Sequence, residues 1–440
     1  MHTILKNMTL IDGTGHVLED AVLVFENDTI IQVGRKNELN CPKGAREYNL
    51  KGKFVIPGLI DAHIHLDMHG MADTYHESLV DDKFRAIRAG LEMGNTVRAG
   101  ITTVRNAGSA HFIDIAVKQA VEEKLIVGPR ILASGKIICM QSAGNEYFKG
   151  LYQEGSGIDE NRKSAREQLK HGADFLKVMA TGAIMNPGGV PGAPQLDLDE
   201  IRVVVQEGKK AGKHTAAHAH GAEGIKNAVR AGVRTVEHGT LADNDALKMM
   251  RDNNVFLTST LSSNFWMLQS NVQNDLPQFM VEKANEVAKI RRENLHRAHS
   301  LGVKVIMGTD AGTPYNFHGK NAVEVVQYVK TGIMDEMTAI IVSTRTAAEG
   351  IGLLDQVGTL EEGKKADCIV FDNNPLEDIE VLCNLNQIRY VFKDGESIKG
   401  EVDIDQWSSA SPLGPKPHST NEQYLTECCT WPRNNKELQK

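Results

Sequence analysis

Two histidines stand one residue apart in the segment PGLIDAHIHLD, residues 57–67. In an extended strand alternate side chains share a face, so His63 and His65 are predicted to point the same way while Ile64 points to the other side. Imidazole is the commonest metal ligand in proteins, and a converging pair suggests a metal site. Composition alone gives roughly 0.6 such His-x-His pairs by chance. The metal interpretation therefore depends on whether distant residues join this pair.

Further reactive side chains stand late in other short apolar runs of the sequence. Lys177 lies in DFLKVMAT, His218 in HTAAHAH, His238 in TVEHG and Asp310 in KVIMGTD. In parallel α/β barrels the chemistry is carried at the carboxyl ends of the strands. We therefore expect these groups to meet His63 and His65 at one rim and to bind metal there.

The segment that must position these groups, residues 58–350, alternates short β-branched runs with longer helical periods. This alternation predicts βα units around a parallel sheet. The length of the segment fits a (β/α)₈ TIM barrel of the α/β class. An open doubly wound sheet is the alternative, but no G-x-G-x-x-G follows the first strand. We predict strands over residues 59–65, 100–106, 130–138, 174–181, 214–220, 235–239, 255–261 and 304–310, and helices over 81–100, 113–124, 198–212, 221–232 and 277–300.

Both ends of the chain contain strand-like runs whose pattern differs from that of residues 58–350. Residues 1–57 contain alternating runs separated by Gly, Asn and Asp turns, which predicts a small antiparallel sheet. Similar runs return within residues 351–400, so we expect one composite β-sandwich domain built from both ends. Residues 401–440 are predicted to form a polar, loosely ordered tail.

Composition narrows the class of protein. The formal net charge is −8 and no basic stripe runs along the chain, which argues against nucleic acid or an anionic membrane as a partner. No apolar stretch has the length of a secretory signal or a membrane span. The six cysteines show no C-x-x-C spacing. We expect a cytoplasmic protein with reduced thiols and a small-molecule or dipeptide substrate, and a homo-oligomer is compatible with the sequence.

The number of metals follows from Lys177. A single metal held by histidines and Asp310 would leave this lysine as a buried cation beside another cation, which is costly. A deprotonated lysine can instead add carbon dioxide and become a carbamate that bridges two metals. In that arrangement His63, His65 and Asp310 hold one metal, and His218 and His238 hold the other. A lysine that extends to the rim or pairs with an acid is the alternative.

The chain resembles the amidohydrolase superfamily of metal-dependent hydrolases, through motifs in order over residues 1 to about 400. Within that superfamily it is similar to the binuclear, imidazolonepropionase-like enzymes often labelled prolidases, which include carboxypeptidases acting on dipeptides and N-acylated amino acids. The resemblance implies a carboxylated Lys177, zinc as the metal, Asp310 as the proton shuttle and a split-terminus β-sandwich. The motifs are PGLIDAHIHL, ADFLKVMATGA, HAHGAEGI, EHGT, GTDAG and VGTLEEGKKADCIVFD.

Two departures from this family pattern concern the substrate. Many relatives have a Gly-Gly-His segment where this chain reads MQSAGNEY, and many have an aspartate at the position of Asn106. His220 stands where relatives have a tyrosine or histidine that orients the substrate carbonyl. We expect His220, Arg105 and the glycine-rich loop 182–192 to bind a substrate carboxylate.

The expected reaction is hydrolysis of an amide bond by a metal-bridging hydroxide, with the carbonyl polarised at the second metal. Asp310 would take the proton of the nucleophile and return it to the departing amine, and His220 would stabilise the oxyanion. Strand alternation turns Glu237 away from this role. The loop over residues 181–197 is expected to act as a lid or as a plain surface loop.

Other hydrolases of the superfamily remain as alternatives. A phosphotriesterase, a lactonase or a cyclic-amide hydrolase would use the same binuclear site. A mononuclear deaminase is disfavoured, because such enzymes typically carry a glutamate three residues after the histidine of the fifth strand, where this chain has Gly221.

Overall fold

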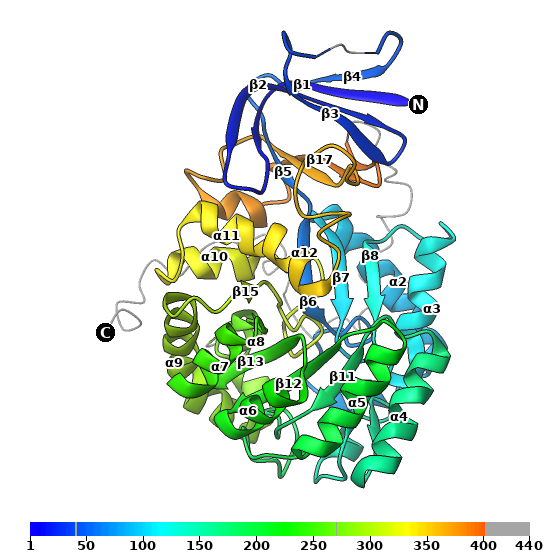
Figure 1. The fold of residues 1–440 in the computed structure, drawn as a ribbon, viewed down its shortest axis with the longest axis vertical. Coiled ribbons are helices and arrows are strands. Elements are labelled where there is room, and N and C mark those ends of the chain that lie inside the picture. Colours follow the sequence, from blue (N-terminus) through cyan, green and yellow to red (C-terminus); the bar gives the residue numbers. More distant parts are fainter. Residues whose placement is uncertain (40–41, 270, 401–440) are drawn as a thin grey trace.

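The computed structural model describes residues 1–39, 42–269 and 271–400. The predicted tail, residues 401–440, lies outside this described part of the chain. Figure 1 shows a central α/β region, with helices packed around parallel strands, and a separate sheet above it. Among the described helices, none combines the length and apolarity needed to cross a bilayer.

The upper sheet contains eight strands and unites the two ends of the described chain. Strand β5 pairs with β1 from the amino-terminal part and with β16 from the carboxy-terminal part. The prediction of an antiparallel sheet over residues 1–57 is wrong in part, because β1 pairs antiparallel with β2 but parallel with β4 and β5. The strands are β1 His2–Ile11, β2 Val17–Glu26, β3 Thr29–Arg35, β4 Arg46–Asn49, β5 Phe54–Pro57, β16 Cys368–Phe371, β17 Ile388–Lys393 and β18 Glu396–Lys399.

The central strands form two parallel sheets, β6-β7-β8 and β10-β9-β11-β12-β13-β14-β15. Backbone hydrogen bonds connect these sheets on both sides. Ala62 and His65 donate to Met307 and Ala311, and Asp174 donates to Ala133. The strands are β6 Leu59–Ile64, β7 Ile101–Asn106, β8 Arg130–Ala133, β9 Ile137–Cys139, β10 Tyr152–Glu154, β11 Leu176–Met179, β12 Thr215–Gly221, β13 Thr235–Leu241, β14 Phe256–Thr258 and β15 Val305–Ile306.

Several predicted strands are longer than those observed: 174–181 is reduced to β11 and 255–261 to β14, and two others are interrupted. The predicted strand 130–138 is divided into β8 and β9, because Gly135 between them adopts a left-handed φ of +68°. The predicted strand 304–310 is reduced to β15, Val305–Ile306, and the chain beyond it reaches Asp310 with a φ of +62°. A left-handed residue disturbs the regular geometry of a strand, and alternation of side chains does not reveal where such a residue stands.

The helices predicted from the sequence are confirmed. Helix α5, for example, begins with a capping box in which Asp197 accepts from the backbone of Glu200 and Glu200 accepts in return. The helices are α1 Thr74–Ser78, α2 Asp82–Arg98, α3 Ile113–Glu122, α4 Gly157–His171, α5 Leu198–Lys210, α6 Ala222–Ala231, α7 Asn244–Asp252, α8 Leu261–Met267, α9 Gln278–Ser300, α10 Val323–Lys330, α11 Glu336–Ser343 and α12 Arg345–Ile351.

One residue beneath the parallel strands is expected to make the fold sensitive to acid. His214 precedes β12 and stacks on Phe175, with ring centroids 5.6 Å apart, and its Nε2 has no hydrogen-bond partner among the described residues. Burial, together with the charges of Arg105 and Arg234, lowers the pKa of His214 from 6.5 to about 3. Below pH 6.5 the unfolded chain therefore binds a proton that the folded chain does not. Stability should fall as pH decreases, by up to about 1.4 kcal/mol per pH unit.

The measurement is the free energy of unfolding in urea at about pH 7 and about pH 5. His214→Phe keeps an aromatic ring against Phe175 and removes the titrating group, so its loss of stability between the two pH values should be smaller by up to about 2 kcal/mol. His296→Gln, at an exposed position, is the control and should behave as wild type. An unchanged pH dependence in His214→Phe would contradict the assignment.

Candidate metal centre

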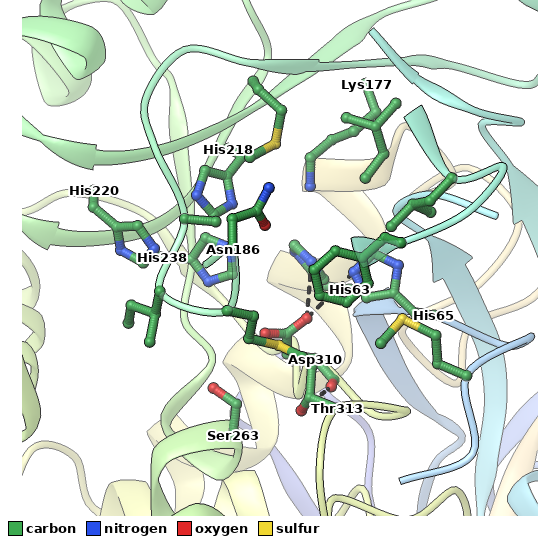
Figure 2. A pocket seen from close by; sticks show the side chains of 18 of the residues that line it. His63, His65, Lys177, Asn186, His218, His220, His238, Ser263, Asp310 and Thr313 are labelled. Carbon is green, nitrogen blue, oxygen red and sulfur yellow. Dashed lines mark hydrogen bonds and ion pairs between the residues drawn. The ribbon is translucent and has the colours of Figure 1, made fainter. Parts of the chain in front are cut away.

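The reactive groups predicted from the sequence meet in one pocket at the ends of the parallel strands. The pocket contains about 650 Å³ of empty space and is partly open to solvent. Figure 2 shows these side chains pointing toward a common centre from opposite walls. The predicted residues that line it are His63, His65, Lys177, His218, His220, His238 and Asp310.

The first ligand group consists of His63, His65 and Asp310, whose ligand-type atoms all lie within 4.8 Å of one another. The Nε2 atoms of both histidines lie 3.4 Å from Oδ1 of Asp310. Nδ1 of His63 contacts Glu237 Oε2 at 2.7 Å, and Nδ1 of His65 contacts the carbonyl of Gly108 at 2.9 Å. These acceptors favour a proton on Nδ1 and leave Nε2 free to bind a metal.

The second ligand group consists of His218, His220 and His238, again with ligand-type atoms within 4.8 Å. Their ring centroids lie 4.6 to 4.9 Å apart. Nε2 of His218 is buried and has no hydrogen-bond partner in the described chain. A buried nitrogen of this kind is costly unless it meets a ligand, so it fits a bound metal.

His220, like His238 beside Thr260, has a threonine hydroxyl as its ring partner, so either ring nitrogen can carry the proton. Its Nδ1 lies 2.9 Å from the hydroxyl of Thr240, which can either donate or accept. If the hydroxyl accepts, Nε2 of His220 is free to act as a metal ligand. If the hydroxyl donates, Nε2 carries the proton and can donate to a substrate. The sequence indicated only the second role.

Lys177 lies between the two ligand groups and is almost fully buried. Figure 2 shows its amine pointing between His218 and His63. Among the described residues its Nζ has no hydrogen bond and no ion pair, although its side chain is only 1% exposed. Burial lowers the pKa of Lys177 from 10.5 to about 8. A substantial share of the amine is therefore neutral near neutral pH and able to react as a nucleophile.

Left-handed backbone at two positions aims ligands into the pocket. His238 has a φ of +72° and Asp310 a φ of +62°. Such residues are uncommon and are found where surrounding structure holds them, often at functional sites. The backbone turn at His238 lets this residue line the pocket directly after Glu237, whose carboxylate is directed to His63. Glu237 itself does not line the pocket. That Glu237 takes no part in the proton transfer remains a prediction.

A buried network holds the Asp310 segment against β6. Asp61 accepts from the backbone of His63 and of Thr309, each at 3.1 Å, and from the Thr309 hydroxyl at 2.5 Å. Gly308 passes so close to β6 that a Cβ at this position would lie 2.8 Å from the Cβ of His63. The GTDAG motif is therefore explained by close approach of two backbones as well as by its aspartate.

Arg105 requires a correction. We expected it to bind substrate, but it is fully buried and does not line the pocket. Its guanidinium donates to the carbonyl of Ala62 at 2.7 Å, to Thr235 at 3.0 Å and to Glu237 at 2.8 Å. Burial alone would raise the pKa of Glu237, but Arg105 and His63 lower it below its ordinary value. Arg105 thus keeps Glu237 ionised, and Glu237 orients His63.

The remaining walls contain residues that the sequence did not indicate. Arg291 and the neighbouring Asn264 and Ser263 contribute polar groups from α9 and α8. An amphipathic helix normally turns arginine to solvent, so nothing in the pattern of α9 marked Arg291 as buried. The apolar lining residues are Met68, Ile137, Phe148, Leu151, Met179, Ile184, Met185 and Met267.

The glycine-rich loop lies on the pocket, as its position in the sequence suggested. Ala183 to Asn186 line the pocket, and Gly182 exchanges backbone hydrogen bonds with Ala193 and Gly192 at the base of the loop. Lys283 on α9 donates to the carbonyls of Asn186 and Gly189 at 3.0 and 2.7 Å. The loop is thus tied to α9, and its action as a lid remains a prediction.

Comparison with known proteins agrees with this geometry. The amidohydrolase family model matches residues 54–398. A solved Xaa-Pro dipeptidase with methionine bound in its active site is 31% identical, with a TM-score of 0.84 over 91% of this chain and 100% of that one. A prolidase complexed with N-methylphosphonate-L-proline is 29% identical, with the same TM-score and coverage. Ochratoxinase of Aspergillus niger is 27% identical over 90% of this chain and 87% of that enzyme.

Proposed function

We propose that this chain, which belongs to the amidohydrolase family of enzymes that hydrolyse amide bonds, is a binuclear metal-dependent hydrolase of dipeptides or N-acyl amino acids. The observation that carries the proposal is the pair of ligand groups on either side of the unpaired Lys177. A mononuclear enzyme could use histidines of both groups, but it would leave Lys177 as a buried cation beside the metal. The same arrangement therefore disfavours the mononuclear deaminase.

We also propose that the parallel strands of residues 58–350 close into a (β/α)₈ barrel, and that residues 1–57 and 351–400 form a composite β-sandwich domain. Closure is supported by the hydrogen bonds from β6 to residues 307–311 and from Asp174 to Ala133. The composite domain is supported by the pairing of β5 with β16.

The donor set suits two divalent ions, and zinc accords best with the imidazole nitrogens. His63, His65 and Asp310 would hold one ion and His218 and His238 the other. Lys177, carboxylated by carbon dioxide, would supply oxygens to both. When bound there, the ions would provide a nucleophile from water near neutral pH and polarise the amide carbonyl.

Two side chains of the pocket carry the proton and charge transfers in this proposal. Burial raises the pKa of Asp310, but its contacts with His63 and His65 hold the pKa well below its ordinary range. Its carboxylate is thus available to take a proton from the attacking water and return it to the leaving amine. His220, with Thr240 donating to its Nδ1, would donate from Nε2 to the oxyanion.

The substrate class rests on the pocket and on the relatives. Among the relatives are an Xaa-Pro dipeptidase with bound methionine, a prolidase with bound N-methylphosphonate-L-proline and an ochratoxinase, and the first two support peptides of amino acids as the substrate class. The wall formed by Met68, Phe148, Leu151 and Met185 suits an apolar group. From the absence of the Gly-Gly-His segment of many relatives we infer a preference for neutral or hydrophobic carboxy-terminal residues.

The test is a panel of dipeptides, N-acyl amino acids, cyclic amides, lactones and phosphotriesters, with kcat/KM measured for each. Amides of carboxy-terminal amino acids should lead the panel, since planar amide carbonyls suit a binuclear site. Activity should disappear on treatment with a chelator and return with zinc. Lactones or phosphotriesters that exceed the amides by about tenfold or more would reject the amide assignment in favour of those alternatives.

A further inference from the structure

Arg291 is a buried cation of the pocket wall that has no carboxylate partner among the described residues. Its side chain projects from α9 and the residue is only 4% exposed. Nη1 donates to Asn264 Oδ1 at 2.7 Å and to Ser263 Oγ at 3.1 Å, and Nη2 donates to Thr260 Oγ1. All of these acceptors are neutral. A buried guanidinium is normally paired with an acid, so Arg291 is an exception.

The donors of Arg291 are also incompletely used. Its Nε is buried without a hydrogen-bond partner, and its Nη2 lies 3.1 Å from Nδ1 of His238. If Nε2 of His238 binds a metal, Nδ1 carries the proton and cannot accept from Arg291. Unsatisfied buried donors on a charged group are costly, which implies that an anion completes this site.

No acid of the described chain is free to supply that anion. Asp310 belongs to the first ligand group. Glu324 is the other carboxylate that acts on the charge of Arg291, but it accepts from Ser259, from the backbone of Leu261 and from both donors of Ser262. The charge of Arg291 therefore faces the pocket without compensation from the protein.

The two ends of the pocket differ in chemistry. Arg291 lies beside His238, at the end of the pocket that also contains Asn264 and Ser263. The apolar cluster that contains Met68, Ile137, Phe148, Leu151 and Met179 reaches His65 through Met68, whose backbone donates to the carbonyl of His65, and reaches His218 through Met179, which pairs with it between β11 and β12. A substrate with one anionic and one apolar end would therefore bind in a single direction.

We propose that Arg291 binds the α-carboxylate of the amino acid that leaves, and that the acyl part of the substrate occupies the apolar end. The inference rests on the proposed amide hydrolysis and narrows it to amides with a carboxylate beside the scissile bond. It replaces Arg105 by Arg291 as the arginine that contacts substrate. A planar guanidinium with two free donors matches a carboxylate in shape as well as in charge.

The test compares N-acetyl-L-phenylalanine with its carboxamide, N-acetyl-L-phenylalaninamide, by release of acetate. Arg291→Met should lower kcat/KM for the acid by about a hundredfold and for the carboxamide by much less, because only the acid loses a charged hydrogen bond. Asn264→Asp gives Nη1 of Arg291 a carboxylate partner in a side chain of almost the same shape. This variant should also lower kcat/KM for the acid more than for the carboxamide. Lys289→Met, an exposed position on the same helix, should leave the ratio unchanged.

Binding supplies a second readout that does not depend on turnover. By calorimetry on the metal-loaded protein, L-phenylalanine should bind more tightly than L-phenylalaninol, in which a hydroxymethyl group replaces the carboxylate, and Arg291→Met should remove this preference. Equal losses for acid and carboxamide, together with loss of metal, would show that Arg291 only supports His238 and would overturn the inference. A wild type that cleaves both amides equally would overturn it while leaving the proposed function intact. A wild type that cleaves neither, but shows the Arg291-dependent preference in binding, would overturn the function and keep the anion site.

Discussion

Lys177→Ala is expected to lose both bound metal and hydrolytic activity. The variant removes the side chain between the two ligand groups, whose imidazoles alone would have to hold the charges of two ions close together. Several kcal/mol of metal assistance disappear with the ions, so kcat/KM should fall by at least about a thousandfold. The fold should persist, since Lys177 has no hydrogen bond or ion pair among the described residues to lose.

Elemental analysis and kcat/KM measure this outcome together. Wild type should contain close to two divalent ions per chain, and Lys177→Ala clearly fewer. Short carboxylates such as acetate should restore part of both values by entering the space of the missing side chain. Lys289→Ala, at an exposed lysine of α9, is the control and should keep both metals and activity. A Lys177→Ala protein with two metals and normal turnover would reject the bridging role.

Asp310→Asn should separate metal binding from proton transfer. Asparagine keeps an oxygen within reach of His63 and His65, so much of the metal should remain bound. The amide cannot accept and return a proton, so kcat should fall by the ~10²–10⁴ typical for loss of a general acid–base group. KM should change far less, because Asp310 acts on the nucleophile and the leaving amine.

The measurements are kcat, KM and metal content of the same preparations. Asp275→Asn, an identical change at an exposed residue, should match wild type in all three. If Asp310→Asn retained its metals and a near-normal kcat, the proton would have to travel through another group, and His220 would be the first to examine. A joint loss of metal and kcat would instead assign Asp310 to metal binding alone.

The orientation of the substrate has a consequence for engineering. If the carboxylate lies at Arg291 and the acyl group against Met68 and Phe148, changes at the apolar end should alter acyl selectivity without weakening recognition of the carboxylate. The MQSAGNEY segment, which replaces a Gly-Gly-His segment of many relatives, contributes Asn145, whose amide contacts Met140 and Glu154 rather than the pocket. Under the proposal made for Arg291, carboxylate recognition would come from α9 and not from this segment.

What the sequence determined by itself is the set of elements and the ligand-type residues. Alternation along β6 placed His63 and His65 on one face, and helical periods located α2, α5 and α9 to within two residues of their ends. These patterns are local, because side-chain direction in a strand or helix repeats over a few residues. The convergence of the reactive residues followed from one further rule, that parallel strands carry their chemistry at their carboxyl ends.

Only the tertiary structure decided how deep each side chain lies and which partner it meets. Arg105 and His63 both point inward, yet Arg105 lies below the pocket and is held by Glu237, a residue 132 positions away. The left-handed backbone of His238 breaks the strand alternation that predicted the direction of the Glu237 side chain. Helix α9 buries Arg291, although an amphipathic helix usually turns arginine to solvent. Depth, backbone handedness and long-range pairing depend on how strands and helices pack across the whole domain, and no short-range pattern in the sequence records that packing.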